Sequence, residues 1–60
     1  MENRKRTKTY RVTFAYTGNY KIEAFESGKM ILSIILNDYN VEGACGVLDA
    51  LGYRCTKREF

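Results

Sequence analysis

The chain has 60 residues, of which ten are Lys or Arg and seven are Asp or Glu; it contains two Cys and no His, and its net charge is +3. This length allows one domain, with a core so small that such chains often depend on disulfides, metals or oligomerisation. Two cysteines without a histidine are too few for a structural zinc site, and no apolar run approaches the ~18 residues of a membrane span.

The two cysteines, Cys45 and Cys55, are interpreted as small buried apolar residues rather than as a disulfide. The basic start of the chain runs directly into an alternating segment without an apolar leader, so we expect a cytoplasmic protein in which both thiols stay reduced. Oligomerisation, most simply as a homodimer, is then the expected supplement to the small core. No metal or cofactor is predicted.

Charge is distributed unevenly along the chain. Residues 1–11, 12–52 and 53–60 carry net charges of +4, −3 and +2, so both ends are basic and the middle is mildly acidic. The first seven residues lack apolar periodicity, which predicts a flexible basic arm at 1–7 ahead of a single α+β domain at 8–60. A solvated tail is the simplest interpretation of this arm, and contact with nucleic-acid phosphate is the alternative.

A β-hairpin is predicted first along the chain. Residues 8–16 alternate with a period of two and place aromatic and β-branched side chains on one side, which is typical of a half-buried strand. Residues 20–25 alternate in the same way. Between them, residues 17–19 contain Gly and Asn, which can take the positive φ of a turn.

The segment after the hairpin allows two interpretations. Lys29, Ser33 and Asn37 recur every four residues, which draws a narrow polar stripe along a helix that Ser27 would cap. On these grounds we predict a helix. The alternative is a strand at 29–37, because this apolar run alternates almost as well and contains β-branched isoleucines. In either form the segment exposes more apolar surface than one contact can cover, which favours a second copy as its partner.

Residues 41–53 predict the clearest helix. Their apolar side chains fall on one arc at about 100° per residue, Asn40 stands at the N-cap position, and Gly52 can close the helix in the left-handed conformation. A margin of small residues beside this arc lets another backbone come close, either a second helix of the same chain or a second subunit. These small residues are Gly43, Gly46 and Ala50.

A last strand is predicted at 53–60, with Cys55 toward the core and Arg54, Thr56 and Arg58 outward. The predicted fold is therefore α+β in the order ββααβ, a hairpin and a C-terminal strand with one face covered by two helices. With the strand alternative for the central segment, the order becomes βββαβ.

The residues argue against catalysis. The chain has no His to act as a general base, no Ser or Cys with an evident base beside it, and no glycine-rich phosphate loop. We therefore predict a protein that is not an enzyme.

A binding surface is the better supported prediction. If helices cover one face of the sheet, the opposite face carries cations, hydroxyls and one ring, which can neutralise phosphates, donate to them and stack on a base. An ordinary solvated sheet face, with Glu23 opposing the cations, is the simpler interpretation. With the arm included, the predicted nucleic-acid-binding residues are Arg4, Lys5, Arg6, Lys8, Arg11, Lys21, Phe25, Arg54 and Arg58.

Two functional hypotheses result. The first is a small basic binding module that contacts DNA, RNA or a nucleoprotein as an accessory or regulatory factor. The alternative is a protein–protein interaction factor, an inhibitor or adaptor of a mobile element, that uses an apolar helix surface. The predicted interface residues are Met30, Ile31, Ile34, Ile35, Gly43, Gly46 and Ala50.

Overall fold

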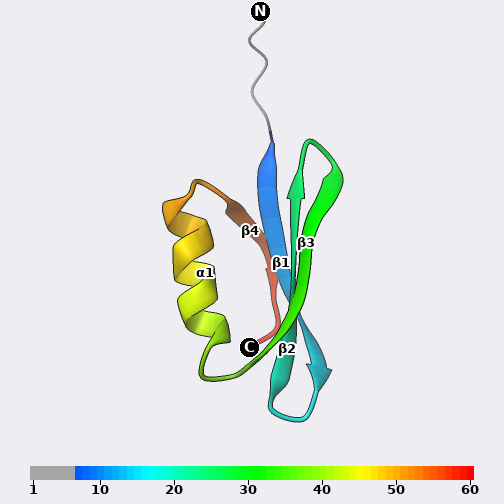
Figure 1. Cartoon of the computed structure of the whole chain (residues 1–60), viewed down its shortest axis with the longest axis vertical. Coiled ribbons are helices and arrows are strands. Elements are labelled where there is room, and N and C mark those ends of the chain that lie inside the picture. Colours follow the sequence, from blue (N-terminus) through cyan, green and yellow to red (C-terminus); the bar gives the residue numbers. More distant parts are fainter. Residues whose placement is uncertain (1–6) are drawn as a thin grey trace, which may run out of the picture.

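A computed structural model describes residues 7–60 as a four-stranded sheet with one helix against one face (Figure 1). The elements along the chain are β1 (Lys8–Tyr16), β2 (Asn19–Glu26), β3 (Lys29–Asn37), α1 (Val41–Ala50) and β4 (Arg54–Arg58). In space the strands run in the order β3-β2-β1-β4. The small α+β fold is confirmed. The order is βββαβ, so the two-helix order ββααβ is wrong and its stated alternative is right.

The hairpin of β1 and β2 follows the alternating pattern that predicted it. The two strands are antiparallel, with Lys8 opposite Glu26 at one end and Phe14 opposite Tyr20 near the other. Gly18 takes a φ of 75° in the connecting turn, a conformation that favours glycine. β2 begins at Asn19, one residue earlier than the alternation alone indicates.

β3 is the element for which the predicted helix is wrong. A two-residue turn joins it to β2, and both turn residues have positive φ, 55° at Ser27 and 82° at Gly28, so Ser27 caps no helix. β3 then pairs with β2 along its whole length, from Glu26–Lys29 to Asn19–Asn37. Lys29, Ser33 and Asn37 do recur at helical spacing in the sequence. The free edge of β2, however, offers backbone hydrogen-bond partners at every position, and this tertiary contact outweighs the local helical pattern.

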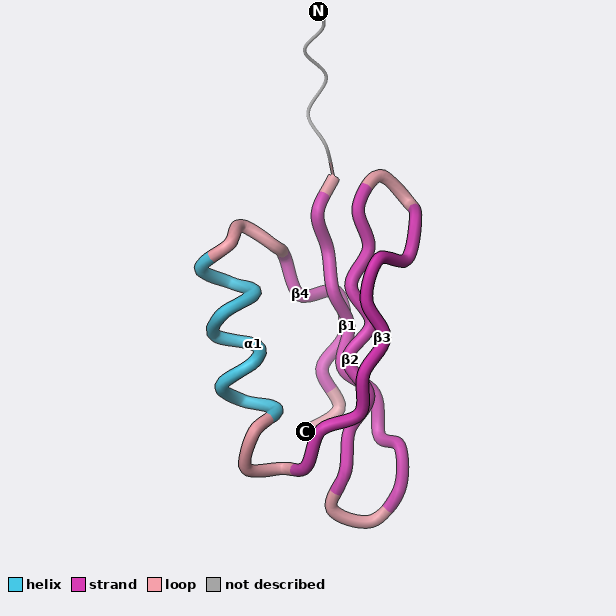
Figure 2. Tube along the Cα trace, viewed as in Figure 1, coloured by secondary structure: helices cyan, strands magenta, loops and turns pink. Residues whose placement is uncertain are grey.

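α1 carries the chain from one edge of the sheet to the other. β3 and β4 both run parallel to β1, and parallel strands need a crossover connection of this kind (Figure 2). The helix ends where predicted, with Gly52 at a φ of 94°. Asn40 stands at the N-cap position but its side chain makes no capping hydrogen bond; the Asn37 Oδ1 instead accepts from the backbone N–H of Tyr39 and of Asn40, at 3.1 and 2.9 Å.

The core lies between α1 and the two central strands. Val41, Cys45 and Leu48 recur at helical spacing on the face of α1 that turns to the sheet. Opposite them, alternate residues of β1 and β2 are completely or almost completely buried. These strand residues are Tyr10, Val12, Ile22 and Ala24. Because strand side chains alternate between faces, the residues between them turn away from α1 and form the open face of the sheet.

Candidate functional site

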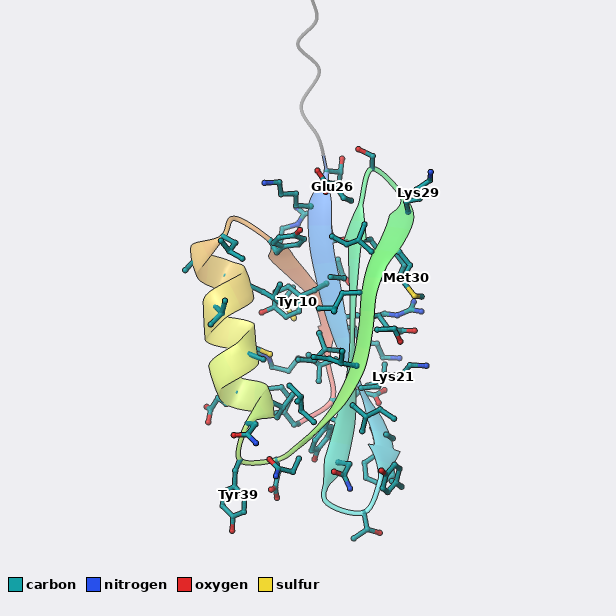
Figure 3. The ribbon with its side chains drawn as sticks, in the orientation of Figure 1. Tyr10, Lys21, Glu26, Lys29, Met30 and Tyr39 are labelled. Carbon is teal, nitrogen blue, oxygen red and sulfur yellow. The ribbon has the colours of Figure 1, made fainter. Side chains whose placement is uncertain are left out.

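The open face gathers side chains from all four strands. The strand register aligns them in rows that cross the sheet. One row is Arg54, Thr9, Phe25 and Met30; the next is Lys57, Arg11, Glu23 and Ser33; the third is Thr13, Lys21 and Ile35. Neighbouring strands lie ~4.8 Å apart, so each row is a compact set of side chains. In Figure 3, Lys21 and Met30 point away from α1, whereas Tyr10 lies between the sheet and the helix.

Glu23 is the centre of this face. It is only 7% exposed although no helix covers it. Arg11 Nε donates to its Oε1 at 2.6 Å, and Lys21 Nζ lies 3.6 Å from its Oε2. The hydrogen bond from Arg11 is the main reason that the pKa of Glu23 lies below its usual value. Two of the face's cations are therefore partly neutralised and held in place.

Phe25 is already in contact with a cation. The guanidinium carbon of Arg11 lies 5.2 Å from the centre of the Phe25 ring, within the range of a cation–π contact. Arg11 thus joins the ring and the carboxylate of Glu23. The planar group that this face offers for stacking is the Arg11–Phe25 pair rather than a bare ring.

The structure brings together four of the predicted nucleic-acid-binding residues. Arg11, Lys21, Phe25 and Arg54 share the open face. Arg54 is exposed and, among residues 7–60, has no carboxylate within ion-pair distance. Three predicted residues, Arg4, Lys5 and Arg6, lie outside the described part of the chain.

Arg58 is on the helix side of the sheet, so its expected placement on the open face is wrong. Between Tyr10–Cys55 and Arg11–Lys57 the register of β1 and β4 shifts by one residue. Beyond this irregularity each β4 side chain turns to the other face, which a strict alternation from Cys55 cannot foresee. Lys57 consequently occupies the open face, and it pairs with Glu59 at 3.2 Å.

Lys8 also lies on the helix side, since it shares the side of Tyr10 and its ammonium lies 5.8 Å from the centre of the Tyr53 ring. Thr56, predicted to point outward, sits at the register shift and donates from its hydroxyl to the backbone oxygen of Tyr10 at 3.2 Å. Neither side chain adds to the open face.

A polar network ties β4 to α1 through a buried tyrosine. The hydroxyl of Tyr10 donates to Asp49 Oδ1 at 2.7 Å and accepts from Arg58 Nη2 at 3.2 Å. Burial, more than any other effect, raises the pKa of Tyr10 far above its ordinary range, and the hydrogen bond to Asp49 adds to this. The network gives Arg58 a structural role.

The predicted interface residues separate into two groups. Met30, Ile31, Ile34 and Ile35 lie on β3, an edge strand, and are 36–50% exposed. The small residues of α1 are exposed too, but a Cβ built at Gly43 or Gly46 meets nothing within 4 Å, so the two glycines mediate no close helix packing among residues 7–60. The apolar surface expected on a helix therefore belongs to a strand.

An apolar groove of about 250 Å³ runs between α1 and β3 on the helix side. It opens because α1 packs over β1 and β2, while the outer strand adds only partly buried side chains, Leu32 and Leu36, to the core. Its lining is formed by Ile22, Leu32, Ile34, Ala44, Val47 and Leu48. No signal in the sequence indicates this groove, since it depends on β3 being a strand.

Other kinds of site find little support in residues 7–60. That part of the chain holds no cluster of three or more His, Cys, Asp or Glu side chains that could bind a metal ion. Both thiols are free, and Cys45 is buried, which raises its pKa. None of the described helices is long and apolar enough to cross a membrane. Comparison of the chain with family models, curated proteins and solved structures found no match.

Proposed function

We propose that this protein is a small non-enzymatic binding module whose open face contacts the phosphates of DNA or RNA. The observation that carries the proposal is the convergence of four cations from three adjacent strands on a face that α1 leaves uncovered. These cations are Arg11, Lys21, Arg54 and Lys57. Cations in such an array bind phosphates and release counterions, which drives association.

The chemistry of the face favours a sequence-independent contact. Thr9 and Thr13 supply hydroxyls beside the cations, and hydroxyls are common donors to phosphate oxygens. The Arg11–Phe25 pair offers a planar surface to an unpaired base, because bases stack on guanidinium planes as well as on rings. Glu23 limits the strength of the contact, since it already engages Arg11 and Lys21.

Salt dependence tests this proposal. Binding of the full chain to fluorescent single-stranded and double-stranded oligonucleotides is measured by anisotropy at increasing salt. Four phosphate contacts predict a slope of log K against log salt of about −3 for single strands and about −4 for duplexes. Absence of binding at low salt, or an affinity that does not change with salt, overturns the proposal.

A matched pair of variants locates the contact. Arg54→Ala removes a cation of the open face and is expected to lower affinity for every sequence while reducing the salt slope by about 1. Lys29→Ala removes the same charge from the far edge, where Lys29 is paired across from Glu26 on the helix side, and is expected to change affinity little. Equal losses in both variants would mean that net charge alone drives binding, which contradicts a specific face.

Protein–protein interaction is the second candidate function, and the exposed apolar side chains of β3 favour it. An exposed sheet edge can add a strand from a partner. Recovery of a stoichiometric protein partner, in a complex that persists after nuclease treatment and at high salt, would support protein–protein interaction over nucleic-acid binding. A partner that is released by nuclease would support nucleic-acid binding by the open face instead.

A further inference from the structure

β3 presents an unprotected edge to solvent. It is the outermost strand of the sheet and is nine residues long. Among residues 7–60, no strand lies beside the backbone N–H and C=O groups of β3 that point away from β2. Ile31, Ile34 and Ile35 are 36–50% exposed. A long, apolar, exposed edge strand is a template for pairing with another chain.

The distribution of charge along β3 favours a second copy of the same strand as its partner. Between Met30 and Asn37 the strand has no charged residue, so nothing repels an identical strand. Lys29 stands at its beginning and Asp38 follows its end. When two copies lie antiparallel, the Lys29 end of one meets the Asp38 end of the other, and opposite charges come together at both ends of the contact.

We infer that two copies of this chain pair through β3 in antiparallel fashion, which joins their sheets into one sheet of eight strands. Such an interface is isologous, because the same strand is used by both copies. This inference builds on the protein-interaction candidate and specifies a second copy of the chain as the partner. The dimer does not depend on nucleic-acid binding, and it places both helices on the same side of the joined sheet.

The register of the pairing follows from the regular part of β3. A bulge interrupts its pairing with β2 between Ala24–Leu32 and Phe25–Met30, so residues 32–37 are the uninterrupted stretch. On the helix side this stretch presents Leu32, Ile34 and Leu36, and Ile34 is the middle one of the three. With the twofold axis there, each Ile34 faces its own counterpart, and Leu32 of one copy faces Leu36 of the other. All of these side chains are apolar and lie on the helix side.

The residues that pair in this register also line the apolar groove. Ile34 and Leu32 form the β3 part of the sheet wall of the apolar groove beside α1. In the dimer these residues gain apolar neighbours from the second copy at the end of the groove that opens onto the sheet edge. The gain in buried apolar area supplies the stability that the small core of one chain lacks.

Sedimentation of the pure protein without nucleic acid tests the inference. The chain has a mass of 6.9 kDa, and we expect a concentration-dependent species of twice that mass. Ile34→Lys places two ammonium groups at the twofold axis and is expected to weaken dimerisation on the order of 100-fold. Val47→Lys adds the same charge to the helix wall of the groove, away from the strand edge, and is expected to leave the dimer in place.

Amide hydrogen exchange of the unmodified protein provides a measurement that does not depend on a variant folding. In the dimer, amides of β3 that point away from β2 are expected to exchange more slowly as protein concentration rises, while those of β4 do not change. A protein that sediments at 6.9 kDa at all concentrations, with exchange in β3 unaffected, overturns the inference. Equal loss of dimer in both lysine variants would assign the contact to the groove and also overturn strand pairing.

Discussion

The two edges of the sheet differ in how they are protected. β4 is five residues long and carries Arg54, Lys57 and Arg58, and the network of Tyr10 ties it to α1. β3 is nine residues long and uncharged from Met30 to Asn37, and among the described strands it pairs with β2 alone. Charge and a short length keep an edge strand from recruiting another chain. β4 is therefore an edge that ends the sheet, whereas β3 is an edge to which another strand can be added.

The largest expected effect contrasts the covered half of the molecule with the bare edge. Leu48 is 9% exposed and packs between α1 and the sheet, so Leu48→Ala is expected to lower the free energy of unfolding by about 2–4 kcal/mol. Ile35 is 47% exposed on the open face, and Ile35→Ala in dilute solution is expected to cost less than ~1 kcal/mol. Urea denaturation followed by circular dichroism measures both. Similar costs would mean that β3 is packed as firmly as the core, which contradicts the comparison.

A middle-sized effect concerns the bonds that hold β4. Tyr10→Phe leaves the ring in place but removes the hydroxyl that joins Asp49 to Arg58, and it is expected to lower the free energy of unfolding by about 1–2 kcal/mol. Amide exchange in β4 is expected to quicken while exchange in β3 stays the same. Faster exchange in both strands alike would indicate global destabilisation without a specific link to β4.

The same hydroxyl predicts how stability depends on alkaline pH. Because the folded pKa of Tyr10 is raised above its ordinary value near 10, its stabilising contribution is complete below pH 10 and is lost as the pH rises above it. The urea midpoint of the wild type is therefore expected to decrease as the pH is raised above 10. The part of this fall that disappears in Tyr10→Phe belongs to this residue, and an unchanged slope in the variant would contradict the assignment.

A smaller effect than that of Tyr10→Phe is expected at Glu23, where stability and oligonucleotide affinity change in opposite directions. Glu23→Gln weakens the contacts with Arg11 and Lys21 and is expected to cost about 1 kcal/mol at neutral pH, since both cations are partly exposed. The freed cations are expected to raise affinity for oligonucleotides by several-fold. A variant that loses affinity would show that Glu23 positions Arg11 for binding.

The acid side of the stability curve follows from the same carboxylate. The folded pKa of Glu23 lies below its ordinary value of 4.5, so its contribution is present above that pH and is lost as the pH falls through the folded pKa. The wild type and Glu23→Gln are therefore expected to differ at neutral pH and to converge in acid. A difference that persists to the lowest pH at which both fold would exclude the ion pair as its source.

Local patterns were sufficient for several elements. The alternation of residues 8–16 predicted β1 with its observed bounds, and the apolar arc after Asn40 predicted α1 together with its end at Gly52. These patterns suffice because each element buries one face, and burial of one face imposes its own period on the residues. The same alternation assigned Arg11, Lys21, Phe25 and Arg54 to one face of the sheet.

Two features depended on contacts between elements distant from one another. Residues 29–37 fit a helix or a strand equally well in isolation, and the free edge of β2, which supplies backbone partners along the whole length, makes them a strand. The exchange of Arg58 for Lys57 on the open face depends on one register shift between β1 and β4. A single-residue shift reverses every later side chain, and no local period records it, because the shift is set by how two distant strands meet.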